Sequence, residues 1–249
     1  MHIAGTSQRY RSGERVALFL PCYADVAYPE VGKAVIALFE RLGVPLDYPV
    51  EQTCCGQPAF NSGYWPEART LAQHFAEVFN GYDWIVVPSG SCAAMCKVFY
   101  RMIEPGDAAC EIGGRVCELS TFLVDALGTT DVGARFPHSM TYHDGCHGRR
   151  ELNVGDRALR LLRSVKDATL IELPAVDECC GFGGLFSVKF DELSASMGRH
   201  KCDNVKATGA DVLVSGDPSC LAHIGGMLAR DPAARSIRIL HLAQVLAST

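Results

Sequence analysis

Residues 54–56 read Cys-Cys-Gly, and the same tripeptide returns at residues 179–181. Each copy is flanked by one cysteine upstream and one downstream, which are Cys22 and Cys92 for the first copy and Cys146 and Cys220 for the second. Equivalent cysteines are 124, 125 and 128 residues apart, so the thiols recur almost in register. The repeat predicts a chain of two similar halves, each with its own set of four sulfurs.

The composition is that of a globular chain and gives no sign of a nucleic-acid partner or a transmembrane segment. With 249 residues, 48% of them hydrophobic, the chain has room for one large core or for two cores of about 125 residues each, and the repeat favours two. The net charge of −5 and the absence of a Lys/Arg run argue against a nucleic-acid partner. Neither a signal peptide nor an apolar run long enough for a transmembrane segment is visible. We therefore expect a soluble, cytoplasmic protein.

Twelve cysteines in a reducing compartment point to metal binding or redox chemistry, because thiols there stay reduced. An even count is compatible with a secreted disulfide framework, but the missing signal peptide and the apolar content argue against it. Cys110, Cys117 and Cys202 have no counterpart in the other half, so we interpret them as packing residues. The eight repeated cysteines are different, since packing does not require the same spacing twice.

Hydrophobic periodicity predicts alternating strands and helices. Strands are expected over residues 16–20, 46–50, 84–87, 140–143, 170–173 and 212–214, and helices over 31–42, 68–79, 158–165 and 191–207. The halves close with residues 119–123 and 240–244, which we match to each other, followed by short apolar helices over 124–127 and 245–247. This order favours an α/β fold of two pseudo-symmetric halves, each a small, mainly parallel sheet with helical crossovers. We place an N-terminal extension at 1–14 and the two domains at 15–131 and 132–249.

All the repeated cysteines follow the carboxyl end of a predicted strand. Ligands of open parallel sheets bind in the crevice outside those strand ends. We therefore predict one crevice in each half, with two sets of metal ligands: Cys22, Cys54, Cys55 and Cys92, and Cys146, Cys179, Cys180 and Cys220.

The adjacent cysteine pair favours an iron–sulfur cluster over a single ion. Thiolates bind both zinc and iron–sulfur clusters, but consecutive side chains diverge and can reach different irons of a cluster. The glycine after each pair allows a sharp turn and leaves its N–H free to donate to sulfur. We predict clusters of the 4Fe-4S type, with zinc in one half as an open alternative. Metal-free thiol–disulfide chemistry ranks last, because a disulfide between adjacent cysteines is strained.

Several neighbours of the cysteines are further candidates. Cys96 shares a helical face with Cys92, and His223 lies three residues after Cys220, so each is a possible additional ligand. His143 and His147 flank Cys146 and suit supporting or proton-coupled roles. Arg149 and Arg150, with His147, are candidates for binding a substrate carboxylate, although no catalytic residue stands out. The glycines near residue 183 do not complete a dinucleotide-binding motif.

Three longer segments give the chain a family resemblance. They are residues 54–64 (CCGQPAFNSGY), 88–92 (PSGSC) and 179–189 (CCGFGGLFSVK), and the closing residues 241–246 (HLAQVL) also fit. The chain resembles the duplicated cysteine-rich CCG domain found in heterodisulfide reductase and in the iron–sulfur subunits of glycolate oxidase and anaerobic glycerol-3-phosphate dehydrogenase. It is most similar to the lactate utilisation protein A family, over nearly the whole chain after about Arg15.

The resemblance implies an iron–sulfur oxidoreductase subunit that transfers electrons in the oxidation of L-lactate, a 2-hydroxy acid, to pyruvate. Its implied partners are a ferredoxin-like iron–sulfur protein and a third small subunit. In the heterodisulfide reductase relative, five cysteines hold each non-cubane four-iron cluster. Here Cys92 and Cys96 are separated by three residues instead of two, and no second thiol follows Cys220. A four-cysteine cluster, or zinc in one half, therefore stays open, as does a zinc-stabilised assembly module without redox activity.

Overall fold

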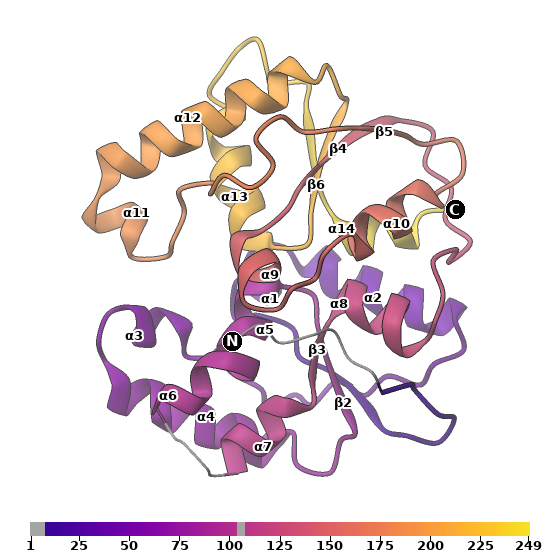
Figure 1. Ribbon diagram of the computed structural model, residues 1–249, viewed down its shortest axis with the longest axis vertical. Helices are drawn as coiled ribbons and strands as arrows, with labels where there is room; N and C mark the ends of the chain where they lie inside the picture. The colour runs from indigo at the N-terminus through magenta and orange to yellow at the C-terminus, as the bar shows by residue number, and fades with distance from the viewer. Residues whose placement is uncertain (1–7, 104–107) are drawn as a thin grey trace.

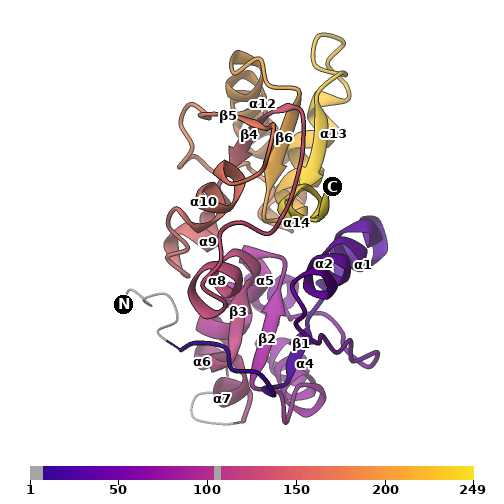
Figure 2. The same cartoon turned by 90° about the vertical axis from the view of Figure 1, so that its right-hand side faces the viewer.

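The computed structural model describes residues 8–103 and 108–249, and it contains two parallel sheets, one in each half of the chain (Figures 1 and 2). The first sheet has the order β1-β2-β3, formed by β1 (Val16–Leu18), β2 (Trp84–Val87) and β3 (Val116–Glu118). The second has the order β5-β4-β6-β7, formed by β4 (Ser139–His143), β5 (Thr169–Ile171), β6 (Val212–Ser215) and β7 (Arg238–His241). The predicted α/β class with two similar halves is confirmed.

Helices connect the strands and cover both faces of each sheet. In the first half they are α1 (Cys22–Ala27), α2 (Pro29–Arg41), α3 (Gln57–Asn61), α4 (Trp65–Val78), α5 (Gly90–Ala94), the π-helix η1 (Met95–Phe99), α6 (Tyr100–Ile103), α7 (Ala108–Gly114), α8 (Leu119–Thr121) and the π-helix η2 (Phe122–Ala126). In the second half they are α9 (Cys146–Arg150), α10 (Arg157–Arg163), α11 (Phe186–Lys189), α12 (Asp191–Ala207), α13 (Pro218–Leu228) and α14 (Leu242–Ala247). The helix predicted over 191–207 coincides with α12. Within the described residues, no helix is both long and apolar enough to cross a membrane.

The two sheets follow the same plan, with one edge reduced in the first half. Where β5 pairs with β4 in the second half, the first half has a single parallel bridge between Ala17 and Asp47. The strand predicted over 46–50 is therefore wrong in extent. Pro45 and Pro49 bracket this segment, and proline has no N–H to donate to a neighbouring strand.

The strand register also corrects the predicted match between the closing segments. Val87 pairs with Glu118 in the first sheet, and its counterpart Ser215 pairs with His241 in the second. Glu118 and His241 are therefore equivalent, so Leu119 corresponds to Leu242 and not to Leu240. The final helices begin directly after these strands, earlier than the residues 124 and 245 expected from the sequence.

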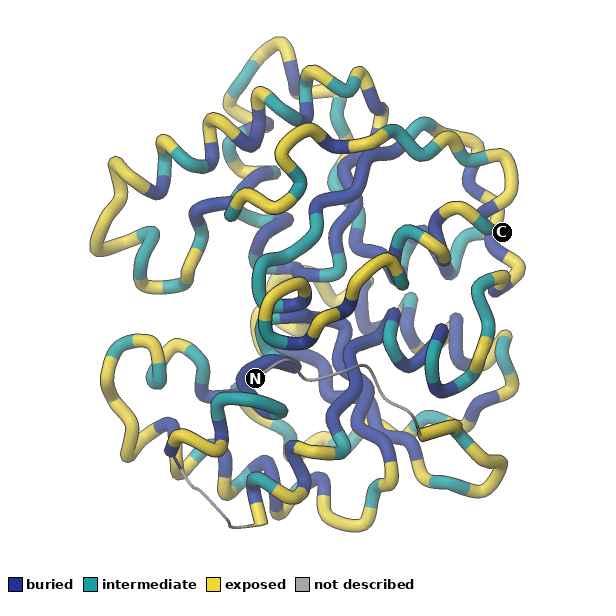
Figure 3. The backbone as a smooth tube through the Cα atoms, viewed as in Figure 1, coloured by how far each residue is buried: buried dark blue, intermediate teal, exposed yellow. Residues whose placement is uncertain are grey.

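The largest hydrophobic core is shared by the halves, in contrast to the two separate cores predicted from the repeat. Val16 and Leu18 of β1 face this core, while the alternate residue Ala17 faces a smaller outer core of the first half. On the shared side, α2 packs against α14 and α10 against α8. Figure 2 shows α2 beside α14 where the halves meet, and Figure 3 shows the buried strands at the centre of the molecule.

Polar contacts at the same boundary reinforce this packing. Arg41, the last residue of α2, donates to the carbonyl oxygens of Leu246 and Ala247 at the end of α14. Arg157 forms a mostly buried ion pair with Asp125, with 2.7 Å between Nη2 and Oδ2. Of the N-terminal extension, residues 1–7 lie outside the described part, and Tyr10 packs edge-on against Phe122. The halves therefore form one body, which fixes the strand ends of one relative to those of the other.

Candidate metal centre

The eight repeated cysteines line a single cleft between the halves, with a volume of about 220 Å³. The carboxyl ends of β2 and β6 point toward each other, and α5 packs against α9 where the two halves of the chain meet (Figure 1). The two crevices predicted from the sequence therefore open into one space. The sheets bring all eight candidate ligands to it: Cys22, Cys54, Cys55, Cys92, Cys146, Cys179, Cys180 and Cys220.

Each half positions its four sulfurs with the same local structures. Cys22 and Cys146 are the first residues of α1 and α9, which begin shortly after the first strand of each half. The Cys-Cys pairs lie in the loops before α3 and α11. Cys92 and Cys220 lie in the first turns of α5 and α13, after the central strands. Cys55 and Cys180 are both 2% exposed, so the second cysteine of each pair forms the closed inner end of its site.

The glycine of each Cys-Cys-Gly sequence turns the chain and donates to sulfur, as predicted. Gly56 has a φ of +87°, and its N–H donates to Cys54 Sγ over 3.4 Å. Gly181 has a φ of +90°, and its N–H donates to Cys179 Sγ over 3.4 Å. Glycine adopts this left-handed conformation without the steric penalty of a side chain. Backbone donors of this kind orient and tune metal-bound thiolates.

The same environment favours one thiolate in each half. Cys54 accepts hydrogen bonds from the Cys22 thiol, the Cys55 thiol and the Gly56 N–H. These bonds, of which the one from Cys22 has the largest effect, lower the pKa of Cys54 to about 3. The Cys146 and Cys180 thiols do the same for Cys179 and lower its pKa to about 2. The thiolate is the form of cysteine that binds metal. Each half thus holds an anionic sulfur with further sulfurs close around it.

The two possible extra ligands lie outside the cleft. Cys96 is buried in the outer core of the first half, where its thiol lies 3.4 Å from the Tyr100 hydroxyl. His223 lines a separate groove and faces Ser194, with 3.5 Å between Nε2 and Oγ. Neither residue lines the space that the eight sulfurs share. The sequence placed both near a site by spacing alone, and spacing does not show which way a side chain turns.

Of the three residues considered for carboxylate binding, only His147 lines the cleft. Its Nδ1 lies 3.6 Å from Cys146 Sγ, and its Nε2 lies 3.5 Å from Gln57 Nε2 of the other half. Arg149 forms an ion pair with Asp144, with 3.6 Å between Nη1 and Oδ2, and Arg150 is exposed outside the cleft. These arginines are therefore not positioned to hold a substrate in the cleft.

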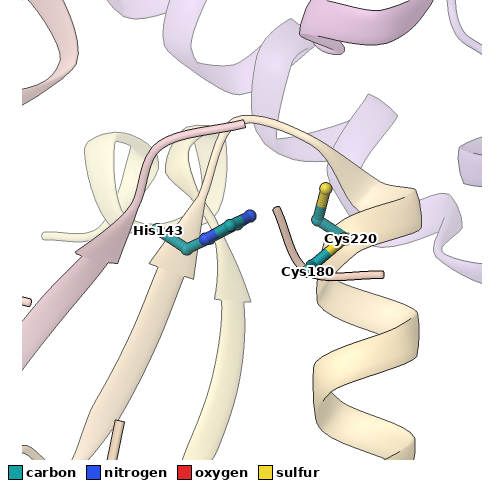
Figure 4. A group of neighbouring side chains, drawn as sticks. All are labelled: His143, Cys180 and Cys220. Atoms are coloured by element: carbon teal, nitrogen blue, oxygen red, sulfur yellow. The ribbon is translucent and has the colours of Figure 1, made fainter. Parts of the chain in front are cut away.

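His143 lies closer to the sulfurs than the sequence interpretation implied. One of its ring nitrogens and the sulfurs of Cys180 and Cys220 all lie within 4.8 Å of one another. Figure 4 shows the imidazole at the end of β4 pointing toward both cysteines. Within the described parts of the chain, this is the one group of three potential metal ligands that close together. The signal in the sequence was the position of His143, directly at a strand end.

The donor set fits a soft or borderline metal ion. Four sulfurs per half and backbone N–H donors to sulfur are the environment of iron–sulfur clusters, and compact sulfur–imidazole sets also bind zinc. Within the described residues no three ligands of the Cys22 set form such a compact group, which suits the separated metals of a cluster better than a single ion. The Cys146 set is compact around Cys180, Cys220 and His143 and fits either.

Comparisons with known proteins agree with the repeat. The family model for the cysteine-rich CCG domain matches residues 16–97 and again residues 140–225. A protein of Oceanobacillus iheyensis named lactate utilization protein A is 41% identical to this chain, over 93% of it and 96% of the relative. A protein of the same name from Geobacillus kaustophilus is 46% identical, over 93% of the chain and 98% of the relative. The chain belongs to the lactate utilization protein A family.

In this member of the lactate utilization protein A family, the two matched segments contain all eight cysteines of the cleft, together with His143. Solved structures are far less similar. A Yersinia pestis structure described as an Asp/Glu racemase covers 94% of the chain at 10% identity and a TM-score of 0.38, and an aspartate racemase homologue from Pyrococcus horikoshii reaches 0.31. Likeness at this level has no bearing on the site.

Proposed function

We propose that this chain is an iron–sulfur oxidoreductase subunit that relays electrons during the oxidation of L-lactate to pyruvate in the cytoplasm. The observation that carries the proposal is the convergence of eight cysteines from two equivalent halves in one cleft. The lactate utilization protein A relatives supply the substrate class. The proposed partners are a ferredoxin-like iron–sulfur protein and a third small subunit.

The stoichiometry of the reaction suits two neighbouring centres. Oxidation of the lactate hydroxyl to the pyruvate carbonyl releases two electrons and two protons, whereas an iron–sulfur cluster transfers electrons singly. When bound, such clusters would supply the electron-accepting chemistry, and this chain holds and shields them. Its own contribution is the set of thiolates, the Gly56 and Gly181 N–H groups that donate to sulfur, and a cleft shared by both sites.

The lining of the cleft favours electron relay over direct binding of the hydroxy acid. Among the described residues that line it, none is lysine or arginine. Binding sites for small carboxylates generally use such a cation, most effectively the two-pronged guanidinium group. We therefore place hydroxy-acid binding on a partner subunit or at the joint surface with it.

The test is to purify the full chain without oxygen and to measure iron, sulfide and zinc together with the EPR spectrum. We expect brown protein with roughly four irons per occupied site and a signal on reduction. Addition of L-lactate with both partner proteins should then reduce the clusters, whereas lactate with this chain alone should not. A colourless chain that stays free of iron after anaerobic reconstitution would rule out the proposal.

The compact group at His143 supports a second candidate, a zinc-stabilised assembly module. Three ligand atoms within 4.8 Å of one another can bind one tetrahedral ion, because zinc–ligand distances are about 2.0–2.3 Å. This candidate predicts stoichiometric zinc, no EPR signal, and loss of structure when zinc is removed with a chelator. The same measurements of metal content and EPR distinguish it from the electron relay.

A further inference from the structure

We propose that His143 is a ligand of the metal held by Cys180 and Cys220. The site of the second half then has mixed nitrogen and sulfur ligands, whereas the first half offers sulfur alone. The inference rests on the proposed function only to the extent that both require a metal in this cleft. The ligand of this site is a transition-metal cation of borderline softness, either one iron of a cluster or a zinc ion. Both metals accept imidazole together with thiolate.

The His143 ring lies in an unusual environment for a buried imidazole. The side chain is 1% exposed, and neither Nδ1 nor Nε2 has a hydrogen-bond partner within the described residues. Buried polar atoms in folded proteins are nearly always satisfied, so a buried imidazole with two unpartnered nitrogens requires an explanation. A metal at the Cys180 and Cys220 sulfurs supplies the missing partner, because one ring nitrogen already lies within 4.8 Å of both sulfurs.

The first half has an apolar residue at the position equivalent to His143. Phe19 lies three residues before Cys22, as His143 lies three residues before Cys146. Phe19 is buried in an apolar environment, with its ring edge-on to Phe75 and 5.1 Å between the ring centroids. The fold therefore accepts a purely apolar side chain at this point. A histidine is not needed there for packing, which leaves ligand binding as the property that distinguishes the second half.

Phe75, which packs against Phe19, is also replaced by a polar residue in the second half. The Cys-Cys-Gly glycines align the helices that follow them: Gly56 approaches the carbonyl of Ala68, and Gly181 approaches the carbonyl of Ser194. Ala68 and Ser194 are therefore equivalent. Seven residues further along, Phe75 in the first half corresponds to Lys201 in the second. Lys201 is fully buried, and its Nζ donates to the Ala175 carbonyl over 2.6 Å. The apolar pair of the first half is thus replaced by an imidazole and a lysine amine beside the second Cys-Cys pair. Two linked polar replacements at one point indicate a site for an anionic metal–thiolate centre.

The difference has a consequence for the direction of electron transfer. We take His143 to occupy the coordination position on its iron that a thiolate fills in an all-sulfur site. A neutral imidazole at that position makes the centre less negative and raises its reduction potential. Lys201, if charged, acts in the same direction. The centre of the second half should therefore be reduced before that of the first, so that electrons entering at the Cys22 set move toward the Cys146 set.

The experiment uses the full chain labelled with ¹⁵N-histidine, loaded anaerobically with iron and sulfide, and examined by pulsed EPR after reduction. We expect the strong nitrogen coupling of a metal-bound imidazole in the unmodified chain. His143→Phe, which introduces the residue found at the equivalent position of the first half, should abolish the coupling and weaken iron retention at the second site at least roughly tenfold. His223→Gln, which removes an imidazole outside the cleft, should leave the coupling intact. His147→Gln should leave it intact as well.

The outcomes separate this inference from the proposed function. Clusters without nitrogen coupling in the unmodified chain would overturn the inference and leave the electron relay standing, and this result does not depend on any variant folding. Coupling that persists in His143→Phe, or that disappears in His147→Gln instead, would also overturn it. If the chain binds zinc in place of iron, X-ray absorption should show one nitrogen at about 2.0 Å beside the sulfurs, and an all-sulfur shell would overturn the inference. A chain that binds neither metal would overturn both proposals.

Discussion

The backbone N–H of Ser91 donates to Oδ2 of Asp217 over 2.9 Å, and this bond joins the two halves beside the cleft. The other carboxylate oxygen of Asp217 accepts from the N–H and hydroxyl of Ser219, over 3.1 and 2.6 Å, and caps the start of α13. Ser89, the counterpart of Asp217, places its hydroxyl 3.4 Å from the same Oδ2. One buried carboxylate therefore orients α13, which carries Cys220, and the start of α5, which carries Cys92.

Substitution of Asp217 should destabilise the whole molecule. We expect Asp217→Ala to lower the free energy of unfolding by about 2–4 kcal/mol, because one buried donor, Ser89, and the half-buried donors of Ser91 and Ser219 lose their acceptor. Asp217→Asn, which keeps one acceptor oxygen, should lower it less. Urea unfolding of the metal-free chain measures both effects. Asp131→Ala is the control, since the Asp131 carboxylate accepts an exposed bond from the Gly133 N–H. An equal effect from that variant would contradict the assignment.

The two Cys-Cys-Gly glycines should tolerate alanine to different degrees. A Cβ on Gly181 would lie 2.6 Å from the Ser194 carbonyl oxygen, whereas one on Gly56 would lie 3.3 Å from the Ala68 carbonyl oxygen. Both positions have positive φ, so alanine is strained by about 1–3 kcal/mol at either. We expect Gly56→Ala to show little beyond this strain and Gly181→Ala to be clearly less stable, because its backbone contact must also move. Thermal unfolding measures the difference, and Gly184→Ala, with positive φ but open space, controls for strain alone.

Removal of one sulfur should affect only its own half of the cleft. We expect Cys180→Ser to lose the metal of the second site and to retain that of the first, so that metal per chain falls by about half. Cys202→Ser is the matched control, because Cys202 is also a buried cysteine of the second half but lies outside the cleft near the Ile224 carbonyl. Elemental analysis of the two variants side by side is the measurement. Equal loss of metal in both would show that folding, and not ligation, had been damaged.

The sequence predicted the positions of the candidate ligands better than their arrangement in space. A cysteine directly after a buried apolar run is recognisable locally, and for this reason the strand ends before Cys22, Cys92 and Cys220 were correctly expected. The merging of two crevices depends on how one sheet is turned against the other. That orientation follows from the packing of α2 on α14, which no local pattern contains.

The role of His143 was underestimated for a related reason. Its neighbours in sequence, Cys146 and His147, suggested a supporting role, whereas its neighbours in space are Cys180 from a later loop and Cys220 from the start of α13. The comparison that reveals it is between Phe19 and His143, and it requires the halves to be aligned by structure. Short strands were also missed: β3 has only three residues, too few for a visible alternation of polar and apolar side chains.

The stability of the metal-free chain should depend on pH through His241, which lies outside the proposed ligand set. His241 is 1% exposed, its Nδ1 accepts from the Ala243 N–H over 3.0 Å, and burial lowers its pKa to about 4, although the nearby Asp217 carboxylate acts in the opposite direction. The unfolded chain binds a proton at this residue below about pH 6.5, while the folded chain does so only below about pH 4. Stability should therefore fall as the pH drops between these values, by about 3 kcal/mol in all.

His241→Asn keeps an acceptor for the helix start but does not titrate. Urea unfolding at about pH 7.5 and about pH 4.5 should show a loss in the unmodified chain that is larger than in the variant by about 2–3 kcal/mol. Equal losses would show that the acid sensitivity comes from other groups.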